Sequence, residues 1–159
     1  MASREPAVAT LLACRHRRGS QKHPRERAKA ECARRGKQAF VAGCMELLAG
    51  HKADADLIVA LGGGPARWAV EGGEPGPDYW LRVWAARGLL WIWDDKASSR
   101  VLDALCDESW RVREMAVKVA ARHRLAAAAP VIADLCCTDD NARVRAAAGR
   151  ATHRLTTPN

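Results

Sequence analysis

The chain has 159 residues and a formal net charge of +8, and its composition is 48% hydrophobic and 28% charged. These values are ordinary for a soluble globular protein, and the length suits one domain with a real core. The single Tyr and single Phe disfavour a β-rich fold, in which aromatic and β-branched residues dominate. No run of about 18 uncharged apolar residues occurs, which excludes a helix that spans a membrane.

The excess positive charge is concentrated at the beginning of the chain. Residues 1–40 contain 11 Lys and Arg against 3 Asp and Glu, whereas residues 41–159 contain 15 of each. The short apolar run near the start follows the acidic Glu5 and precedes basic residues, which is the wrong polarity for a secretory signal peptide. We therefore expect a cytoplasmic protein.

Residues 1–36 form the first predicted segment, which is basic and rich in residues that favour helices. One hypothesis is an arm that binds nucleic acid by neutralising phosphates, and the other is the solvated face of a helix. The segment lacks aromatic residues for stacking on bases, which favours the helix face. The candidate phosphate-binding residues are Arg15, Arg17, Arg18, Lys22, Arg25 and Arg27.

Three related units are predicted downstream, near residues 54–94, 97–124 and 126–155, within an α-solenoid that covers residues 37–155. The sequences "DESWRVR" (107–113) and "DDNARVR" (139–145) share Asp, three free positions and Arg-Val, and "DYWLRVW" (78–84) follows this pattern more loosely. After each one, apolar residues recur at helical spacing, and a shorter apolar helical segment precedes it. Each unit is thus a helix, a turn and a helix that must stack on its neighbours.

The first unit differs from the others because a loop rich in Gly and Pro interrupts it near residues 71–77. The helix predicted after this loop is dense in Trp, which either fills the core or forms a partner site with Arg, since both residue types dominate interface hot spots. Arg82, Arg111 and Arg143 occupy the same position in successive units and are expected to form an exposed row. The candidate partner-binding residues are Trp80, Arg82, Trp84, Arg87, Arg111 and Arg143.

The segments "DESWRVREMAVKVA" and "DDNARVRAAAGRAT" resemble the HEAT-like repeats named for phycobilisome lyases. The resemblance implies an all-α fold, a right-handed α-α superhelix of stacked helix pairs. It also implies an inter-repeat ladder of charged hydrogen bonds, formed by Asp107 with Arg113 and by Asp139 with Arg145. Trp84 takes the place of Arg in the first unit, so the ladder is expected to be broken there.

The segment "DYWLRVWAARGLLWIWDD" is similar to small bacterial HEAT-repeat proteins. This architecture serves many purposes, so the resemblance implies a fold and leaves the function open. The leading hypothesis is a non-catalytic scaffold that binds a protein partner through a concave face lined by the second helices. The competing hypothesis is a nucleic-acid-associated protein that uses the basic N-terminal segment and the Arg row.

Catalysis, metals and cofactors are not expected. The six Cys include no C-x-x-C pair and no His at zinc-finger spacing, which indicates reduced, structural thiols. Every His is followed by Arg, Pro or Lys, which departs from the repeated His-Glu pairs of iron-binding HEAT-repeat hydroxylases. No pair of nucleophile and base can be recognised in the sequence.

Overall fold

The computed structural model describes residues 22–157, and within this range the regular elements are all helices. The α-helices are α1 (Pro24–Arg35), α2 (Lys37–Leu48), α3 (Ala55–Gly62), α4 (Trp68–Glu71), α5 (Tyr79–Trp91), α6 (Ser98–Ala104), α7 (Trp110–Arg122), α8 (Ala129–Thr138) and α9 (Ala142–Thr156). Short 3-10 turns precede three of them: η1 (Gly64–Ala66), η2 (Asp95–Ala97) and η3 (Ala126–Ala128). The predicted all-α class is confirmed.

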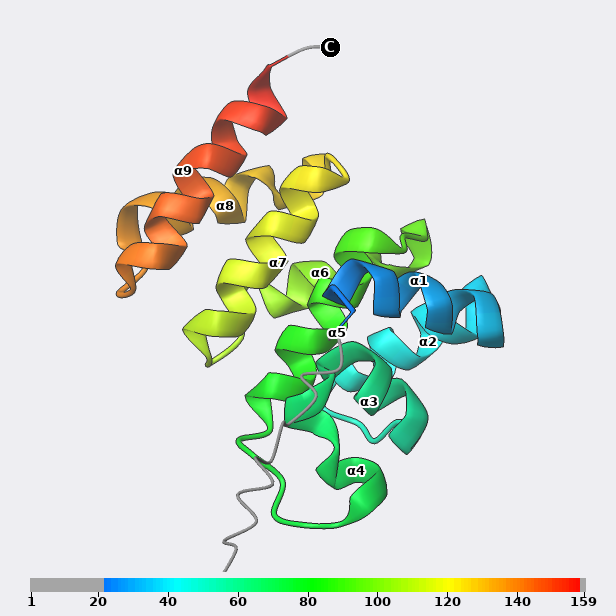
Figure 1. Ribbon diagram of the computed structural model, residues 1–159. Coiled ribbons are helices and arrows are strands. Elements are labelled where there is room, and N and C mark those ends of the chain that lie inside the picture. Colours follow the sequence, from blue (N-terminus) through cyan, green and yellow to red (C-terminus); the bar gives the residue numbers. More distant parts are fainter. Residues whose placement is uncertain (1–21, 158–159) are drawn as a thin grey trace, which may run out of the picture.

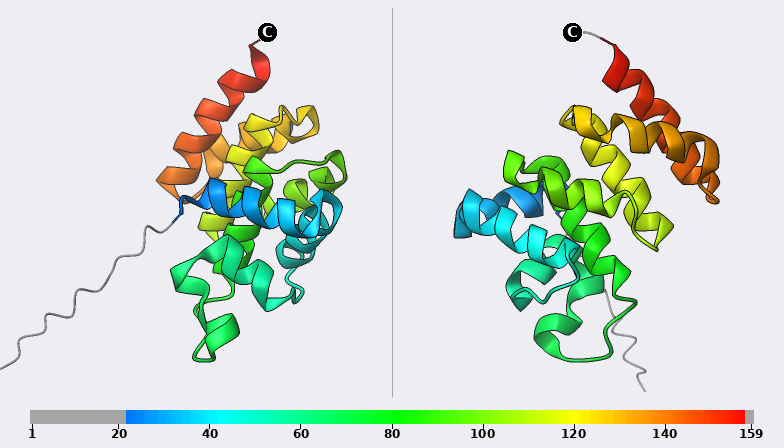
Figure 2. Two further views of the ribbon diagram at one scale, coloured as in Figure 1. Left: turned by 45° about the vertical axis from the view of Figure 1, so that its right-hand side comes forward. Right: turned by 180° about the vertical axis from the view of Figure 1, so that it is seen from behind.

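Helices α5, α7 and α9 lie side by side with α7 in the middle (Figure 1). Helices α6 and α8 pack against α7 and α9 from the other side and come to the front when the molecule is turned around (Figure 2). The helix pair α6–α7 is thus stacked on α5, and the pair α8–α9 is stacked on α7. The other flank of α5 packs against α1, α2 and α3.

The apolar stripes predicted for the last two units face the core. On α7 the stripe buries Val112, Ala116, Val119 and Ala120, and on α9 it buries Val144, Ala147, Ala148 and Ala151. Most of these side chains are small, which allows neighbouring helices to pack with their backbones close together. The helical spacing in the sequence therefore identified the correct faces.

The first unit contains the predicted interruption. Helix α3 ends at Gly63, whose φ of 70° suits a residue without Cβ, and an irregular segment of residues 72–78 joins α4 to α5. Trp84 of α5 packs over the end of α3, where a Cβ on Gly62 would lie 2.6 Å from the indole ring. The missing side chain at Gly62 is what makes room for the Trp in this unit.

Helix α1 belongs to the helical body. His23 caps it, since its Nδ1 accepts from the Arg25 N–H at 3.2 Å, and the Glu26 carboxylate accepts from the His23 N–H at 3.2 Å. Ala28 is buried, and Arg35 donates to the Asp54 carboxylate at 2.7 Å. The part of the basic segment that the structure describes is thus a helix packed on α2, α3 and α5.

Candidate functional site: the face of α5, α7 and α9

Two charge pairs connect the successive units. Arg82 Nε donates to Asp107 Oδ2 at 2.8 Å, and Arg113 Nε donates to Asp139 Oδ2 at 2.7 Å. In each pair a second guanidinium nitrogen reaches the other carboxylate oxygen, which gives the bidentate geometry that Arg favours. The hydrogen bond from Arg113 holds the pKa of Asp139 below its usual value, although burial opposes this shift.

The ladder differs from the expected one in its pairing. Arg113 joins Asp139 of the next unit through its carboxylate, and it reaches Asp107 of its own unit only at the backbone carbonyl, at 2.8 Å. Arg145 likewise donates to the Asp139 carbonyl at 2.7 Å. Each Arg therefore holds the turn of its own unit and, where a further unit follows, also pairs with that unit's Asp.

The prediction that the ladder is broken at Trp84 is wrong. Arg82 lies two residues earlier on α5 and supplies the guanidinium that pairs with Asp107. Its side chain is only 11% exposed, so the prediction that Arg82 belongs to an exposed row is also wrong. The N-cap positions of α7 and α9 are Ser109 and Asn141, and the Asp107 and Asp139 carboxylates accept from the backbone N–H groups of these two residues.

Several predicted partner-binding residues gather where α5, α7 and α9 begin. The Arg111 guanidinium lies 4.4 Å from the Trp110 ring centroid, 5.3 Å from that of Tyr79 and 5.7 Å from that of Trp80. The Arg143 guanidinium lies 5.5 Å from the same Trp110 ring. These distances are typical of cation–π contacts. We refer to Tyr79, Trp80, Trp110, Arg111 and Arg143 as the aromatic–arginine cluster.

Trp80 and Trp84 both line an apolar pocket of about 340 Å³ at the loop that precedes α5. Their rings are stacked with centroids 6.2 Å apart, and the remaining walls include Pro65, Trp68 and Pro77. Trp80 is half-buried, whereas Trp84 is 7% exposed and belongs mainly to the core. Of the two predicted contact residues, Trp80 is the one that presents more of its surface.

Arg87 is engaged inside the protein. Its guanidinium donates to the Leu61 carbonyl at 3.1 Å, and Arg27 donates to the Ala60 carbonyl at 3.1 Å. Both arginines thereby supply donors to carbonyls at the C-terminal end of α3, where a helix favours positive charge. Burial lowers the pKa of Arg87 and of Arg27, and the charge of Arg27 lowers the pKa of Arg87 further.

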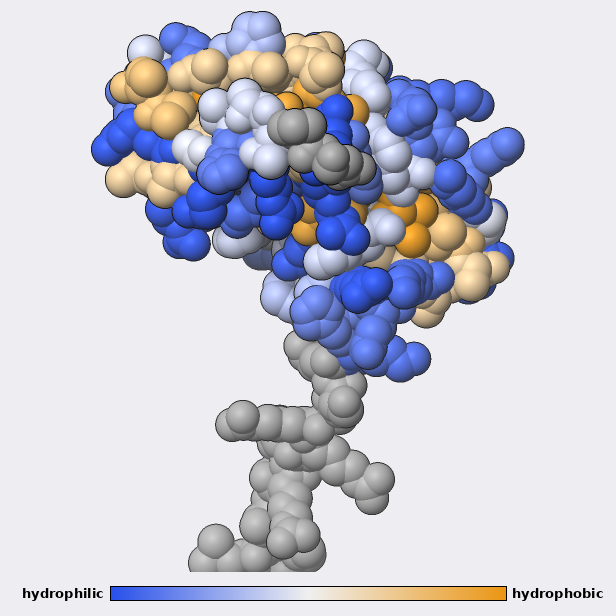
Figure 3. Space-filling view, turned by 90° about the horizontal axis from the view of Figure 1, so that it is seen from above, coloured by the Kyte–Doolittle hydropathy of each residue, from blue (hydrophilic) through white to orange (hydrophobic). Residues whose placement is uncertain are grey.

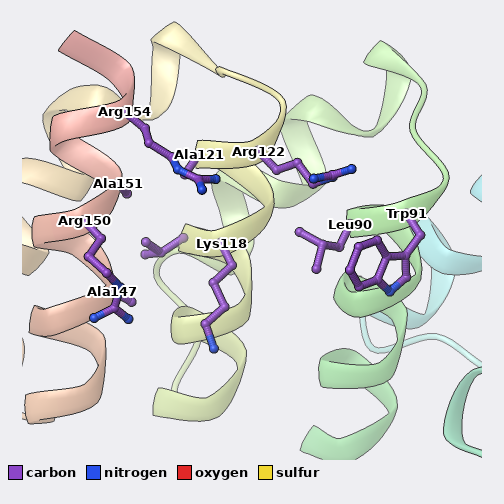
Figure 4. A pocket seen from close by; sticks show the side chains of 10 residues that line it. Leu90, Trp91, Lys118, Ala121, Arg122, Ala147, Arg150, Ala151 and Arg154 are labelled. Atoms are coloured by element: carbon purple, nitrogen blue, oxygen red, sulfur yellow. The ribbon is translucent and has the colours of Figure 1, made fainter. Parts of the chain in front are cut away.

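A groove of about 310 Å³ runs over the middle and the C-terminal halves of α5, α7 and α9. Its floor consists of apolar side chains from all three helices, and its charged residues are all basic. Figure 4 shows Arg154 extending from α9 toward Ala121 of α7 and Arg150 running along α9 toward Ala147, while Arg122 extends from α7 toward α5. The lining residues are Leu90, Trp91, Val117, Lys118, Ala121, Arg122, Ala147, Arg150, Ala151 and Arg154.

Most of the positive charge of this groove has no acidic neighbour. Lys118 pairs with Glu114 at 2.9 Å, but within residues 22–157 no carboxylate forms an ion pair with Arg122, Arg150 or Arg154. The space-filling view toward the end where α9 terminates shows apolar areas bordered by hydrophilic side chains (Figure 3). The groove therefore combines an apolar floor with a positive field.

Sequence reasoning missed these groove cations, although the repeat contains a signal for them. The 32-residue shift that superimposes Arg111 on Arg143 also superimposes Lys118 on Arg150 and Arg122 on Arg154. The last two units thus supply equivalent basic residues one turn apart on α7 and on α9. Applying the shift to the polar positions, and not only to the apolar stripe, would have found them.

The candidate phosphate-binding residues of the N-terminal segment are distributed differently. Arg15, Arg17 and Arg18 lie outside the described residues. Lys22 is exposed and Arg27 is engaged with α3, as described above. Arg25 extends over Trp91, with its guanidinium 5.6 Å from the ring centroid, so α1 adds a further cation beside the groove.

The protein-family model described as "HEAT repeats" matches residues 71–152, which is more than half of the chain and includes α5 to α8 and most of α9. The chain belongs to the HEAT-repeat family. The comparisons with curated proteins and with solved structures found no match. HEAT repeats commonly serve as protein-interaction scaffolds, because stacked units present a long continuous surface.

Two further findings concern the part of this HEAT-repeat protein that the structure describes. Between residues 22 and 157 no three His, Cys, Asp or Glu side chains lie close enough together to hold a metal ion. No helix in the same range is both long enough and apolar enough to cross a membrane.

Proposed function

We propose that this protein is a non-catalytic HEAT-repeat scaffold that binds a protein partner through the face of α5, α7 and α9. The observation that carries the proposal is the groove, which joins an apolar floor from α5, α7 and α9 to four basic side chains, three of which form no ion pair within residues 22–157. Interfaces combine an apolar centre with a polar rim, and Trp and Arg are enriched among the residues that dominate their affinity. The aromatic–arginine cluster extends the same face toward the N-terminal ends of the helices.

Site-specific photo-cross-linking in cells that naturally make the protein tests this proposal. A benzophenone amino acid replaces Arg154 in the groove, and in a control protein it replaces Lys52, which is exposed in the turn between α2 and α3. We expect nuclease-resistant protein adducts from position 154 and none of the same size from position 52. Adducts that disappear on nuclease treatment would contradict a protein partner.

The competing proposal is that the chain associates with nucleic acid. The observation in its favour is the set of basic side chains on this face together with Arg25, to which the N-terminal residues Arg15, Arg17 and Arg18 would add. Binding of this kind weakens steeply with salt, because each neutralised phosphate contributes about 0.9 to the slope of log affinity against log salt. An affinity for duplex DNA with a slope of that kind would support this proposal, and its absence would support the protein scaffold.

A further inference from the structure

We infer that the groove binds an acidic amphipathic helix of the partner, with the apolar side of that helix on the groove floor and its carboxylates against the basic side chains. This inference rests on the proposed function and specifies the chemistry of the partner. It is carried by the composition of the groove floor, by the spacing of its cations and by the finding that three of them form no ion pair with any described residue.

The groove floor favours a helix over an extended chain. Leu90, Val117, Ala121, Ala147 and Ala151 contribute no hydrogen-bonding side chains. An extended segment laid on such a floor would bury backbone N–H and C=O groups without partners, which costs free energy. A helix satisfies its backbone internally and presents only side chains, and the Ala residues allow it to approach closely.

The cations of the groove are spaced to match such a helix. Lys118 and Arg122 on α7 are four residues apart, as are Arg150 and Arg154 on α9. Side chains at this separation lie about 6 Å apart on one face of a helix. Carboxylates at the same separation on a bound helix can therefore pair with successive cations of one row.

Charge complementarity indicates an acidic partner. Arg122, Arg150 and Arg154 have no ion-pair partner among the described residues, so a bound carboxylate would not have to displace an ion pair with any of these residues. Glu114 offsets part of the charge of Lys118, so the excess positive charge of the groove lies on Arg122, Arg150 and Arg154. Long-range attraction between opposite charges also accelerates association.

Nucleic acid matches the same surface less well. Among the described residues, Trp91 is the only aromatic one that lines the groove, and Arg25 and Arg122 already lie over its ring at 5.6 and 5.5 Å from the centroid. Bases need stacking surfaces or hydrogen-bonding groups, and the Ala, Val and Leu of the floor offer neither. We therefore assign the groove to a protein segment and retain nucleic acid as an outcome of the test.

The test measures fluorescence anisotropy with the full chain and synthetic peptides. The probe is a peptide of about 16 residues, or ~24 Å of helix, with Leu and Ala on one face and Glu pairs four residues apart beside them. A peptide of identical composition in scrambled order is the comparison, and a single-stranded DNA of equal charge is the competitor. We expect the amphipathic peptide to bind at least about tenfold more tightly than the scrambled one, and less tightly as salt rises.

Two charge-reversed proteins locate the binding. The double substitution Arg150→Glu and Arg154→Glu changes two exposed residues of the groove, whereas Lys52→Glu with Lys96→Glu changes net charge equally at exposed sites outside it. We expect a loss of about tenfold or more in the first protein and less than about twofold in the second. Circular dichroism and a thermal melt establish that both proteins remain folded.

Four results would overturn the inference. Equal binding of the scrambled peptide, or an equal loss in the two substituted proteins, would reduce the groove to a non-specific positive surface. Tighter binding of the DNA, lost with Arg150→Glu and Arg154→Glu, would assign the groove to nucleic acid. If the acidic peptide fails to bind while cross-linking at Arg154 still gives protein adducts, the scaffold proposal stands and only the acidic helix is excluded.

Discussion

At the scale of single residues, the most constrained side chain of the repeat region is Asp139. Its carboxylate accepts from Arg113 Nε at 2.7 Å, from Arg113 Nη2 at 3.0 Å and from the Asn141 N–H at 2.8 Å, and it is 2% exposed. If the charge of Arg113 were removed, this buried carboxylate would lose its charge partner and keep only the hydrogen bond from the Asn141 N–H. Asp139 thus stabilises the turn between α8 and α9 and also joins this unit to α7 of the preceding unit.

The substitution Asp139→Asn is expected to lower the free energy of unfolding by about 2–3 kcal/mol, because it leaves the largely buried Arg113 without its charge partner. Equilibrium unfolding in urea measures this loss. Glu108→Gln is the matched control, since Glu108 is 85% exposed and lies 3.4 Å from Arg82, and its effect should stay below about 0.5 kcal/mol. Equal losses in the two proteins would contradict the assigned roles.

The free energy of unfolding is expected to depend on pH in the acid range, through carboxylates that accept hydrogen bonds from Arg side chains. The pKa values of Asp139, Asp54 and Glu31 are all lowered, in each case first by the hydrogen bond from an Arg side chain. A lowered folded pKa means that the stabilisation is complete above the unfolded value, near 4, and is lost as pH falls through the folded pKa.

We therefore expect the free energy of unfolding to be nearly constant from about pH 7 to 5 with respect to these groups, and to decline below about pH 4. Urea titrations at a series of pH values test this expectation. In the Asp139→Asn protein the decline should be shallower, because one of the shifted carboxyls is gone. An unchanged acid dependence in this variant would show that Asp139 does not contribute to it.

At the scale of elements, glycines on the helices differ in whether a neighbouring helix leaves room for a side chain. A Cβ on Gly62 would lie 2.5 Å from the Ala66 Cβ and 2.6 Å from the Trp84 ring, both of which are held by the surrounding core. A Cβ on Gly149 of α9 would meet only the Cys136 Sγ at 3.6 Å, an ordinary contact distance. Substitution of Gly62 and substitution of Gly149 are therefore expected to change the stability of the protein in opposite directions.

The substitution Gly62→Ala is expected to destabilise the protein by about 1–3 kcal/mol, since the added methyl group forces α3 and α5 apart. Gly149→Ala is expected to stabilise it by up to about 1 kcal/mol, because Ala is the better helix former and the position is exposed. Thermal and urea unfolding of the two proteins provide the measurement. A gain in both would mean that the packing at Gly62 adapts to the methyl group.

At the scale of the whole molecule, the N-terminal helix decides where the folded unit begins. Ala28 is 1% exposed, Arg27 donates to the α3 carbonyls, and Arg35 pairs with Asp54 at the N-cap of α3. These contacts lie before residue 37, where the sequence placed the start of the solenoid. We therefore propose that the cooperative unit begins with α1.

Removal of residues 1–36 is expected to produce a protein that melts at lower temperature and with less cooperativity, because α2, α3 and α5 lose the helix that covers them. Removal of residues 1–21 keeps α1 with its capping residue His23 and serves as the control. Differential scanning calorimetry compares the two. If both proteins melt alike, α1 is an appendage, and the boundary at residue 37 is correct.

The sequence by itself was sufficient to predict the helical repeat, because the signals for it lie within short segments of the chain. An apolar stripe at helical spacing selects the buried face of α7 and of α9 irrespective of their partners, and Gly and Pro end helices through their own backbone preferences. Both signals depend on positions only a few residues apart. The ladder of charged residues between the units was implied by the resemblance to phycobilisome-lyase-type HEAT repeats, and its pairing differs from the expected one.

Only the tertiary structure decided which charged residue meets which partner. Arg82 and the position of Trp84 are two residues apart on α5, and the packing of α5 against the α6–α7 turn determines which one reaches Asp107. In the packed structure, Arg82 and Arg87 form hydrogen bonds with other parts of the protein. The side chains that line one groove are instead Lys118, Arg122, Arg150 and Arg154. Long, flexible side chains can point to several neighbours, so their contacts depend on how the helices stack and not on local periodicity.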